Sequence, residues 1–198
     1  MTPAPPGHIE TCSGQWVDPF DVDPATVCVE DIAFALSNEC RFGGHLRSCV
    51  ADHSLAVDAA VRSRGASPLT CLHALLHDAH EYVLRDLPNP IKHLPAFDAY
   101  RKACDRAQKR IVAGLGVDVL PGPSGNLIHR CDQAVMIIEA EHGLPSKGRG
   151  WPCADEKMIE FCIEVRPYVE ARMLLPWIPV EAEREWLDEY WILRGVVG

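Results

Sequence analysis

The sequence predicts an all-α helical bundle with a short irregular or β-hairpin cap at its N-terminus. Two observations carry this prediction. After residue 28, apolar side chains recur at the spacing of a helix face, in segments separated by glycines and prolines. Extended pieces joined by turns are confined to residues 1–28, which are rich in proline and aspartate. With 198 residues, 47% of them hydrophobic, the chain can bury one core, so we expect a single domain spanning residues 1–198.

We expect seven helices, and residues that are typical of helix ends support this prediction. Glu30 and Asp31 open the first helix, because negative charge stabilises a helix N-terminus. Gly65 ends the second helix. The third opens at Pro68 and breaks before Pro88, which cannot continue a helix. The expected ranges are about 29–40, 49–64, 68–86, 95–115, 126–141, 158–174 and 181–193.

The second half of the chain has clear breaks between its helices. Gly114 and Gly116 end a long charged helix, and the run PGPSG at 121–125 precedes the fifth. Residues 142–155 hold several glycines and prolines, so we expect a loop on the surface. The last helix is anchored by Trp186 and its aromatic neighbours.

Composition excludes several classes of protein. A net charge of −9 argues against broad nucleic-acid binding, which needs a basic face. No apolar run reaches membrane-spanning length, and the N-terminus lacks the apolar core of a signal peptide, so we expect a soluble, cytoplasmic protein. Nine cysteines without a C-x-x-C pair indicate reduced, buried thiols.

The chemistry is expected in the stretch from Leu72 to Lys92, where a His-Asp doublet occupies the middle of the third predicted helix. His77, Asp78 and Glu81 fall within about 100° of one another on a helical wheel. One helix therefore offers an imidazole and two carboxylates to the same small volume. A transition-metal site would need two more ligands from other helices.

Two residues on other predicted helices can complete such a site. His53 lies on the apolar face of the second helix, and Asp132 borders the apolar stripe of the fifth. Taken alone, His53 is more often a hydrogen-bonded core residue and Asp132 a surface or capping carboxylate. Together with the doublet they give the pattern H…HD…D.

This pattern resembles the HD-domain metal-dependent phosphohydrolases. A second segment, EDIAFALSNECRFGGHLRSCVADHS at 30–54, resembles the phage branch of that family, which includes dATP triphosphohydrolases. The resemblance covers about residues 29–141, the expected core, against which helices at 156–195 should pack. The run around the doublet resembles the core motif of both the phage enzymes and the bacterial 5′-deoxynucleotidases. It comprises His77, Asp78, Ala79, Glu81, Asp86, Pro88, Pro90 and Lys92.

The resemblance implies a cofactor and roles for individual residues. It implies one divalent ion (Zn²⁺, Mn²⁺ or Co²⁺), with Mg²⁺ a further candidate on the substrate phosphates, and Glu81 as the catalytic acid or base. The implied metal ligands are His53, His77, Asp78 and Asp132. The candidate substrate-binding residues are Arg41, Phe42, His45, Asp86, Lys92 and Trp16. His73 and His80 have no partner in the motif and are expected to be structural or exposed.

The function implied is metal-dependent hydrolysis of deoxynucleoside 5′-phosphates. Our first choice is a dATP triphosphohydrolase that yields deoxyadenosine and tripolyphosphate. One alternative is a 5′-deoxynucleotidase that releases phosphate from deoxynucleoside monophosphates. Another is a non-catalytic, metal-stabilised nucleotide-binding module. We expect a small deoxynucleotide as partner, no nucleic acid or membrane, a homo-oligomer, and the host cytoplasm as location if the protein is phage-encoded.

Overall fold

The computed structural model confirms the predicted fold class. It describes residues 4–120, 124–173 and 178–198, and in these ranges the only sheet is a two-stranded hairpin. The predicted helix end at Leu174 and the first three residues of the 121–125 run lie outside the described residues. The strands are β1 (Ile9–Glu10) and β2 (Trp16–Val17), and the helices are α1 (Val29–Asn38), α2 (Val50–Ser63), α3 (Pro68–Leu75), α4 (Glu81–Leu84), α5 (Asn89–Lys92), α6 (Asp98–Gly114), α7 (Ser124–Gly143), α8 (Glu156–Met173) and α9 (Pro179–Val197).

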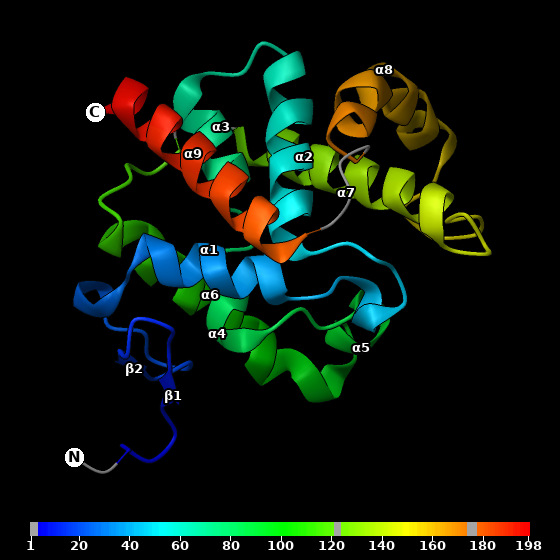
Figure 1. Ribbon diagram of the computed structural model, residues 1–198. Helices are drawn as coiled ribbons and strands as arrows, with labels where there is room; N and C mark the ends of the chain where they lie inside the picture. The colour runs from blue at the N-terminus through cyan, green and yellow to red at the C-terminus, as the bar shows by residue number, and fades with distance from the viewer. Residues whose placement is uncertain (1–3, 121–123, 174–177) are drawn as a thin grey trace.

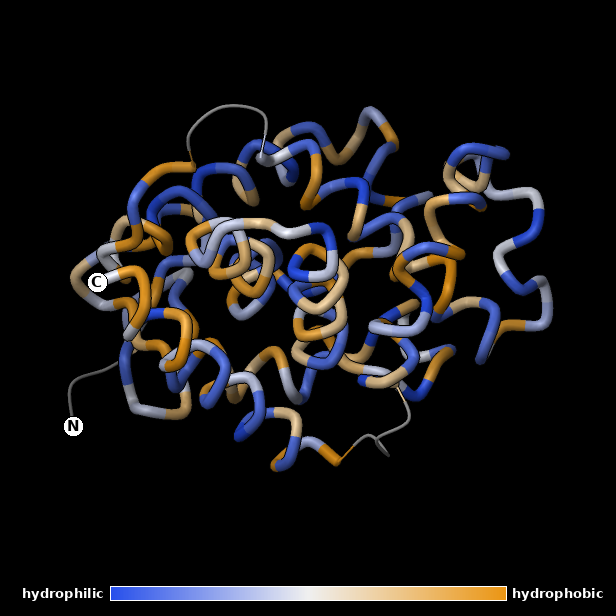
Figure 2. Tube along the Cα trace, turned by 90° about the horizontal axis from the view of Figure 1, so that it is seen from above, coloured by the Kyte–Doolittle hydropathy of each residue, from blue (hydrophilic) through white to orange (hydrophobic). Residues whose placement is uncertain are grey.

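Helix α2 is the central element of the bundle. It packs against α1, α3, α7, α8 and α9, which surround it in Figure 1. Ten of its fourteen residues are buried, as expected for a helix with neighbours on most sides. The other long helices are amphipathic, and hydrophobic and hydrophilic residues alternate along them turn by turn (Figure 2). None of the helices in the described ranges combines the length and apolar character needed to cross a membrane.

The N-terminal hairpin is fixed to the start of α1. Ile9 pairs with Val17 and Glu10 with Trp16 in antiparallel register. The hairpin loop is attached to the first turn of α1 by Asp31. The carboxylate of Asp31 accepts hydrogen bonds from the Ser13 backbone N–H at 2.8 Å and from the Ser13 hydroxyl at 2.7 Å. The hairpin therefore lies at the end of α1 opposite to Asn38 (Figure 1).

The prediction of a continuous helix over 68–86 is wrong for residues 76–80. Helix α3 ends at Leu75 and α4 begins at Glu81, so the His-Asp doublet lies in a turn, residues 76–80. The side chain of Gln108, from α6, interrupts the helix. Its Oε1 accepts from the backbone N–H of His80 at 3.0 Å and its Nε2 donates to the carbonyl of Leu76 at 2.6 Å, the two groups that a continuous helix would join.

The segment expected to be a stiff loop between Asp86 and Lys92 also differs from the prediction. It contains the short helix α5, in which Pro90 occupies the first turn, where its missing N–H costs nothing. Before it, Arg85 has a φ of 69° and terminates α4. Glu39 holds this bend, because its carboxylate contacts Nη2 of Arg85 at 2.6 Å and accepts from the backbone N–H of Asp86 at 3.2 Å.

The cysteines are reduced as predicted, but only five of the nine are buried, and Cys12 is exposed. All nine lie in the described residues, and no disulfide joins any of them. The loop between α1 and α2 is closed instead by an isolated antiparallel bridge between Cys40 and Cys49. Backbone hydrogen bonds from Arg41 to Ser48 and from Val50 to Glu39 flank the bridge. This closure places Arg41 beside the first turn of α2.

Candidate metal centre

Three side chains from distant parts of the chain converge in one cluster. His53 lies in the first turn of α2, His77 in the 76–80 turn, and Asp132 near the middle of α7. One potential ligand atom of each lies within 4.8 Å of the other two. Nε2 of His53 is 3.0 Å from Oδ1 of Asp132, and Nε2 of His77 is 3.8 Å from the same oxygen. Two imidazoles and a carboxylate so placed are a donor set for a divalent transition metal.

Both imidazole rings are oriented by a hydrogen bond on the nitrogen that faces away from the cluster. Nδ1 of His53 is 3.2 Å from a carboxylate oxygen of Glu139, and Nδ1 of His77 is 2.8 Å from the carbonyl of Ala74. When Nδ1 carries the proton, Nε2 presents a lone pair to the cluster. Nε2 of His77 is also buried, and a carboxylate oxygen of Asp78 lies 3.1 Å from it. This arrangement fits a metal ion.

The fourth predicted ligand, Asp78, lies at the edge of the cluster. Its Oδ2 is 3.1 Å from Nε2 of His77 and 4.0 Å from Nη1 of Arg41. Burial opposes ionisation of Asp78, but the neighbouring His77 outweighs it and holds the pKa of this carboxyl well below its usual range. Asp78 is therefore available as a carboxylate ligand at neutral pH.

The cluster favours positive charge at its centre. Burial and the Arg41 cation oppose protonation of His53, yet Glu139 and Asp132 raise its pKa to about 9. Burial likewise opposes protonation of His77, but Asp78 raises its pKa. The negative charge of the carboxylates can thus be balanced in two ways: by protons on the imidazoles, or by a bound cation that replaces those protons.

Glu139 is the functional residue that sequence reasoning missed. It is fully buried on α7 and contacts Nδ1 of His53, accepts from Nε of Arg41 at 3.1 Å, and accepts from the hydroxyl of Ser48 at 3.4 Å. Burial raises the pKa of Glu139, but the charge of Arg41 outweighs this effect, and the pKa is lowered overall. The available signal was spacing, because Glu139 follows Asp132 by seven residues and so shares its helix face.

Glu81, the predicted catalytic acid or base, lies beside Asp78 at the start of α4. It is 2% exposed, and its Oε1 is 3.9 Å from Nζ of Lys92. Burial and the charges of Asp78 and Asp86 raise its pKa well above the ordinary value. A buried carboxyl whose pKa is raised in this way holds its proton more readily and can serve as a proton donor.

His80, expected to be structural or exposed, is buried and belongs to the site. Its Nδ1 is 3.2 Å from Oε1 of Gln108, and its Nε2 is buried without a hydrogen-bond partner. Atoms of Asp78, His80 and Glu81 lie within 4.8 Å of one another, forming a second group of potential ligands.

Two of the predicted substrate residues, Arg41 and Phe42, occupy the loop after α1. Arg41 is buried, and its Nε donates to Glu139 at 3.1 Å, while Nη1 lies 4.0 Å from Oδ2 of Asp78 at the edge of the cluster. Phe42 has a φ of 54°, a strained conformation for an aromatic residue. Its ring lies 6.1 Å from that of Trp151, in the 142–155 loop. In the same loop, burial raises the pKa of Cys153, and the charge of the candidate ligand Asp132 adds a smaller effect in the same direction.

The other predicted substrate residues divide into two sets. Lys92 and Asp86 lie beside Glu81, and burial raises the pKa of Asp86 although the charge of Arg41 opposes this shift. His45 is exposed in the loop that follows Phe42. Trp16 is not brought to the site, because it belongs to the hairpin at the far end of α1, a helix of about 15 Å.

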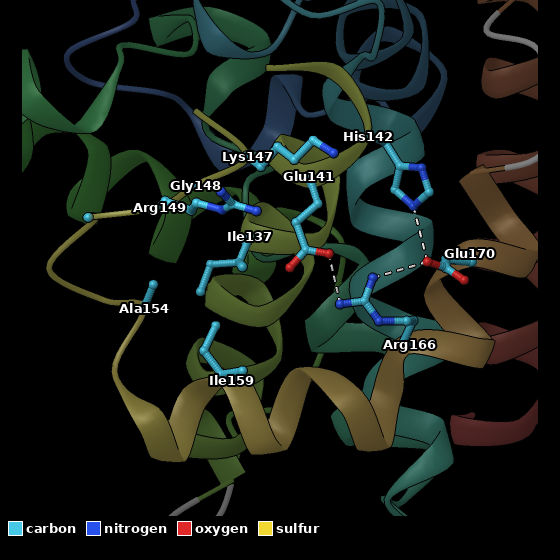
Figure 3. A pocket seen from close by; sticks show the side chains of 11 residues that line it. Ile137, Glu141, His142, Lys147, Gly148, Arg149, Ala154, Ile159, Arg166 and Glu170 are labelled. Carbon is cyan, nitrogen blue, oxygen red and sulfur yellow. Dashed lines mark hydrogen bonds and ion pairs between the residues drawn. The ribbon is translucent and has the colours of Figure 1, made fainter. Parts of the chain in front are cut away.

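One cavity lies beside the His-Asp doublet, and another lies beside α7. One, of about 510 Å³, is lined by His77, His80, Lys92 and residues of α6. The other, of about 630 Å³, lies between α7, the 142–155 loop and α8. There Arg166 and His142 both point at Glu170, and Arg166 also pairs with Glu141 (Figure 3). Neither group of potential metal ligands in the described residues lies in the lining of this second cavity, so we place the candidate centre at the first.

The fold and the site together define a class: a helical bundle whose core holds a histidine and carboxylate cluster able to bind a cation. No family model matches the chain. Uncharacterized protein RCAP_rcc00048 of Rhodobacter capsulatus is 35% identical over 136 residues, which cover 65% of this chain and 69% of that protein, and the chain belongs to the same family. Uncharacterized protein YfdR of Escherichia coli strain K12 is 36% identical over 86 residues, 43% of this chain and 47% of that protein.

Proposed function

We propose that this protein is an HD-type, metal-dependent phosphohydrolase of deoxynucleoside 5′-phosphates, with dATP triphosphohydrolase activity as the first choice. One observation carries the proposal. His53, His77 and Asp132 come from three separate elements, yet both imidazoles present Nε2 to one point beside Asp78. The H…HD…D resemblance supplies the reaction class.

The residues that would hold the ion are His53, His77, Asp78 and Asp132. Their two neutral imidazoles and two carboxylates suit Zn²⁺, Mn²⁺ or Co²⁺. A divalent ion in this set would lower the pKa of a bound water and polarise a phosphoryl oxygen. Glu139 has a positioning role, because its contact with Nδ1 keeps the ring of His53 turned toward the cluster.

Glu81 is the candidate for proton transfer. In the proposed reaction, water attacks the α-phosphorus, the bond from phosphorus to O5′ breaks, and O5′ must gain a proton as deoxyadenosine leaves. Burial and neighbouring carboxylates favour the protonated form of Glu81, which can supply that proton. Lys92, 3.9 Å from Glu81, can then stabilise the resulting carboxylate or contact a phosphate oxygen.

The nucleoside end of the substrate has candidate contacts on the two loops that meet at Phe42. Phe42 and Trp151 offer aromatic faces to a base or sugar, so Trp151 takes the place that the sequence suggested for Trp16. Asp86 can accept a hydrogen bond from the 3′-hydroxyl of a deoxyribose. Glu139 holds Nε of Arg41, and the terminal nitrogens of the guanidinium, one of them 4.0 Å from Asp78, remain available to a phosphate.

A substrate panel tests the proposal. The metal-loaded protein is incubated with dATP, ATP and dAMP, and products are identified by ³¹P NMR, with Asp78→Ala as the matched inactive variant. We expect tripolyphosphate from dATP and none from the variant. Orthophosphate from dAMP without turnover of dATP would identify the 5′-deoxynucleotidase alternative instead. Tight nucleotide binding without any product would identify the non-catalytic binding module.

A further inference from the structure

A second group of metal-type ligands adjoins the first. Asp78, His80 and Glu81 offer atoms within 4.8 Å of one another, and Asp78 also contacts His77 of the first cluster. The proposed mononuclear centre uses neither His80 nor Glu81 as a ligand. Each of these two side chains is more than nine-tenths buried.

The orientation of His80 is fixed by α6. Oε1 of Gln108 accepts from the backbone N–H of His80 at 3.0 Å and lies 3.2 Å from Nδ1. An amide oxygen can only accept, so Nδ1 carries the proton and Nε2 holds a lone pair. That Nε2 atom is buried and has no hydrogen-bond partner. A buried lone pair without a donor is costly unless something fills the position that it faces.

Glu81 also presents a buried acceptor atom that lacks a hydrogen-bond donor. Its Oε2 is buried without a hydrogen-bond partner, and its Oε1 is 3.9 Å from Nζ of Lys92, too far for a hydrogen bond. Asp78 and Asp86 both act on Glu81 with like charge, and Lys92 and Arg41 only partly offset them. Two unpartnered acceptor atoms thus occur where negative charge is in excess.

We propose that Asp78, His80 and Glu81 form a second divalent-cation subsite, which shares Asp78 with the first. One imidazole and two carboxylates suit a transition ion such as Mn²⁺, which also accepts water and phosphate oxygens as further ligands. This inference rests on the metal centre of the proposed function. It revises the predicted stoichiometry from one ion to two, and in the two-ion form Glu81 is a ligand of the second ion in place of the proton donor of the one-ion form.

The subsite has a route to solvent. His80 and Lys92 line the cavity of about 510 Å³ that α6 borders, and exposed Lys102 lies on its wall. His77 of the first cluster lines the same cavity, so this cavity borders both groups of potential ligands.

Counting bound Mn²⁺ ions tests the proposal. The protein is titrated with Mn²⁺ alone, and free Mn²⁺ is measured from its solution EPR signal. We expect two ions per chain for the unaltered protein and one for both His80→Ala and Glu81→Gln. His73→Ala is the matched control on α3, where Nε2 of His73 contacts only the carbonyl of Asp118, and it should still bind two.

Saturation of the unaltered protein at one ion would overturn the second subsite, as would two ions in both variants. If circular dichroism shows that His80→Ala is unfolded, Glu81→Gln decides the question, because it preserves the side-chain shape. The count is independent of turnover. Two ions without hydrolysis of any nucleotide would refute only the proposed function, whereas one ion with hydrolysis would refute only the second subsite.

Discussion

At the scale of single residues, the candidate centre depends on which nitrogen of each imidazole faces inward. Glu139 sets this for His53 and also balances the buried charge of Arg41. We expect Glu139→Gln to weaken binding of the first metal ion by about ten- to a hundredfold, the usual effect of losing such a supporting carboxylate. Isothermal titration with Zn²⁺ measures this change.

The control for that variant is Glu141→Gln. Glu141 lies on the same helix and pairs with Arg166, away from the cluster. Its replacement should leave the Zn²⁺ affinity unchanged. Equal affinities for the two variants would show that Glu139 does not position His53.

Glu81 allows proton transfer to be separated from binding of the first ion. Because Glu81 lies outside the His53, His77 and Asp132 group, Glu81→Gln should retain that ion and still bind nucleotide. We expect kcat to fall by about 10²–10⁴-fold, the range of a lost general acid or base. Steady-state kinetics with dATP measure the loss, and turnover within a few-fold of the unaltered protein would exclude the role.

The sequence predicted the site unevenly at this scale. His53, His77, Asp78 and Asp132 share a pattern, and the structure brings all four together. Glu139 was not identified and His80 was expected to be structural or exposed, because neither occurs in that pattern. Their positions in the site arise from contacts with His53 and Gln108, which lie 86 and 28 residues away in the sequence. Long-range contacts of this kind leave no local periodicity in the sequence.

At the scale of secondary-structure elements, the 76–80 turn positions the side chains of the His-Asp doublet and of His80. Apolar periodicity predicted a continuous helix over 68–86, and it could not reveal that Gln108 enters from α6 and separates the carbonyl of Leu76 from the N–H of His80. The interruption redirects Asp78 and His80 away from ideal helical positions. Tertiary contact has overridden local propensity here.

Replacing this side chain tests the role of the turn. In Gln108→Ala, the Leu76 carbonyl and the His80 N–H are free to form the direct helical bond. We expect helical content to be kept or to rise slightly, while the number of bound Mn²⁺ ions falls. Gln133→Ala on α7 is a matched glutamine control. Undiminished Mn²⁺ binding in Gln108→Ala would show that the turn forms without the inserted amide.

The contact between the hairpin and α1 has a pH dependence of known sign. Burial opposes ionisation of Asp31, but hydrogen bonds from Cys12 and Ser13 outweigh it and lower the pKa. A folded-state pKa below the unfolded value stabilises the protein above the unfolded pKa of about 3.9, and this stability is lost as the pH falls through the folded pKa.

Asp31→Asn should therefore lower the free energy of unfolding by about 1.5–3 kcal/mol at pH 7. The difference from the unaltered protein should begin to shrink below about pH 3.9 and vanish only below the lower folded-state pKa, where Asp31 is neutral as Asn is. Urea denaturation at the two pH values measures it. Asp188→Asn, an exposed change on α9, is the control, and a difference that does not vary with pH would contradict the account.

At the scale of the whole molecule, fold class was the most predictable property. Helical periodicity and glycine or proline breaks predicted all the long helices of the described residues to within a few positions. The pattern could not show that α2 is central, because burial on every side depends on how the other helices pack around it. That packing brings His53 from α2 and Asp132 from α7 to the same point.

Hydrolysis of dATP in ¹⁸O-labelled water tests the central claim most directly. If the metal-loaded centre directs water to the α-phosphorus and the bond to O5′ breaks, one ¹⁸O atom enters a terminal phosphate of tripolyphosphate. Mass spectrometry should then find deoxyadenosine unlabelled, and removal of the metal by EDTA should abolish both products. Labelled deoxyadenosine, labelled dAMP accompanied by pyrophosphate, or no turnover by the metal-loaded protein would contradict the claim.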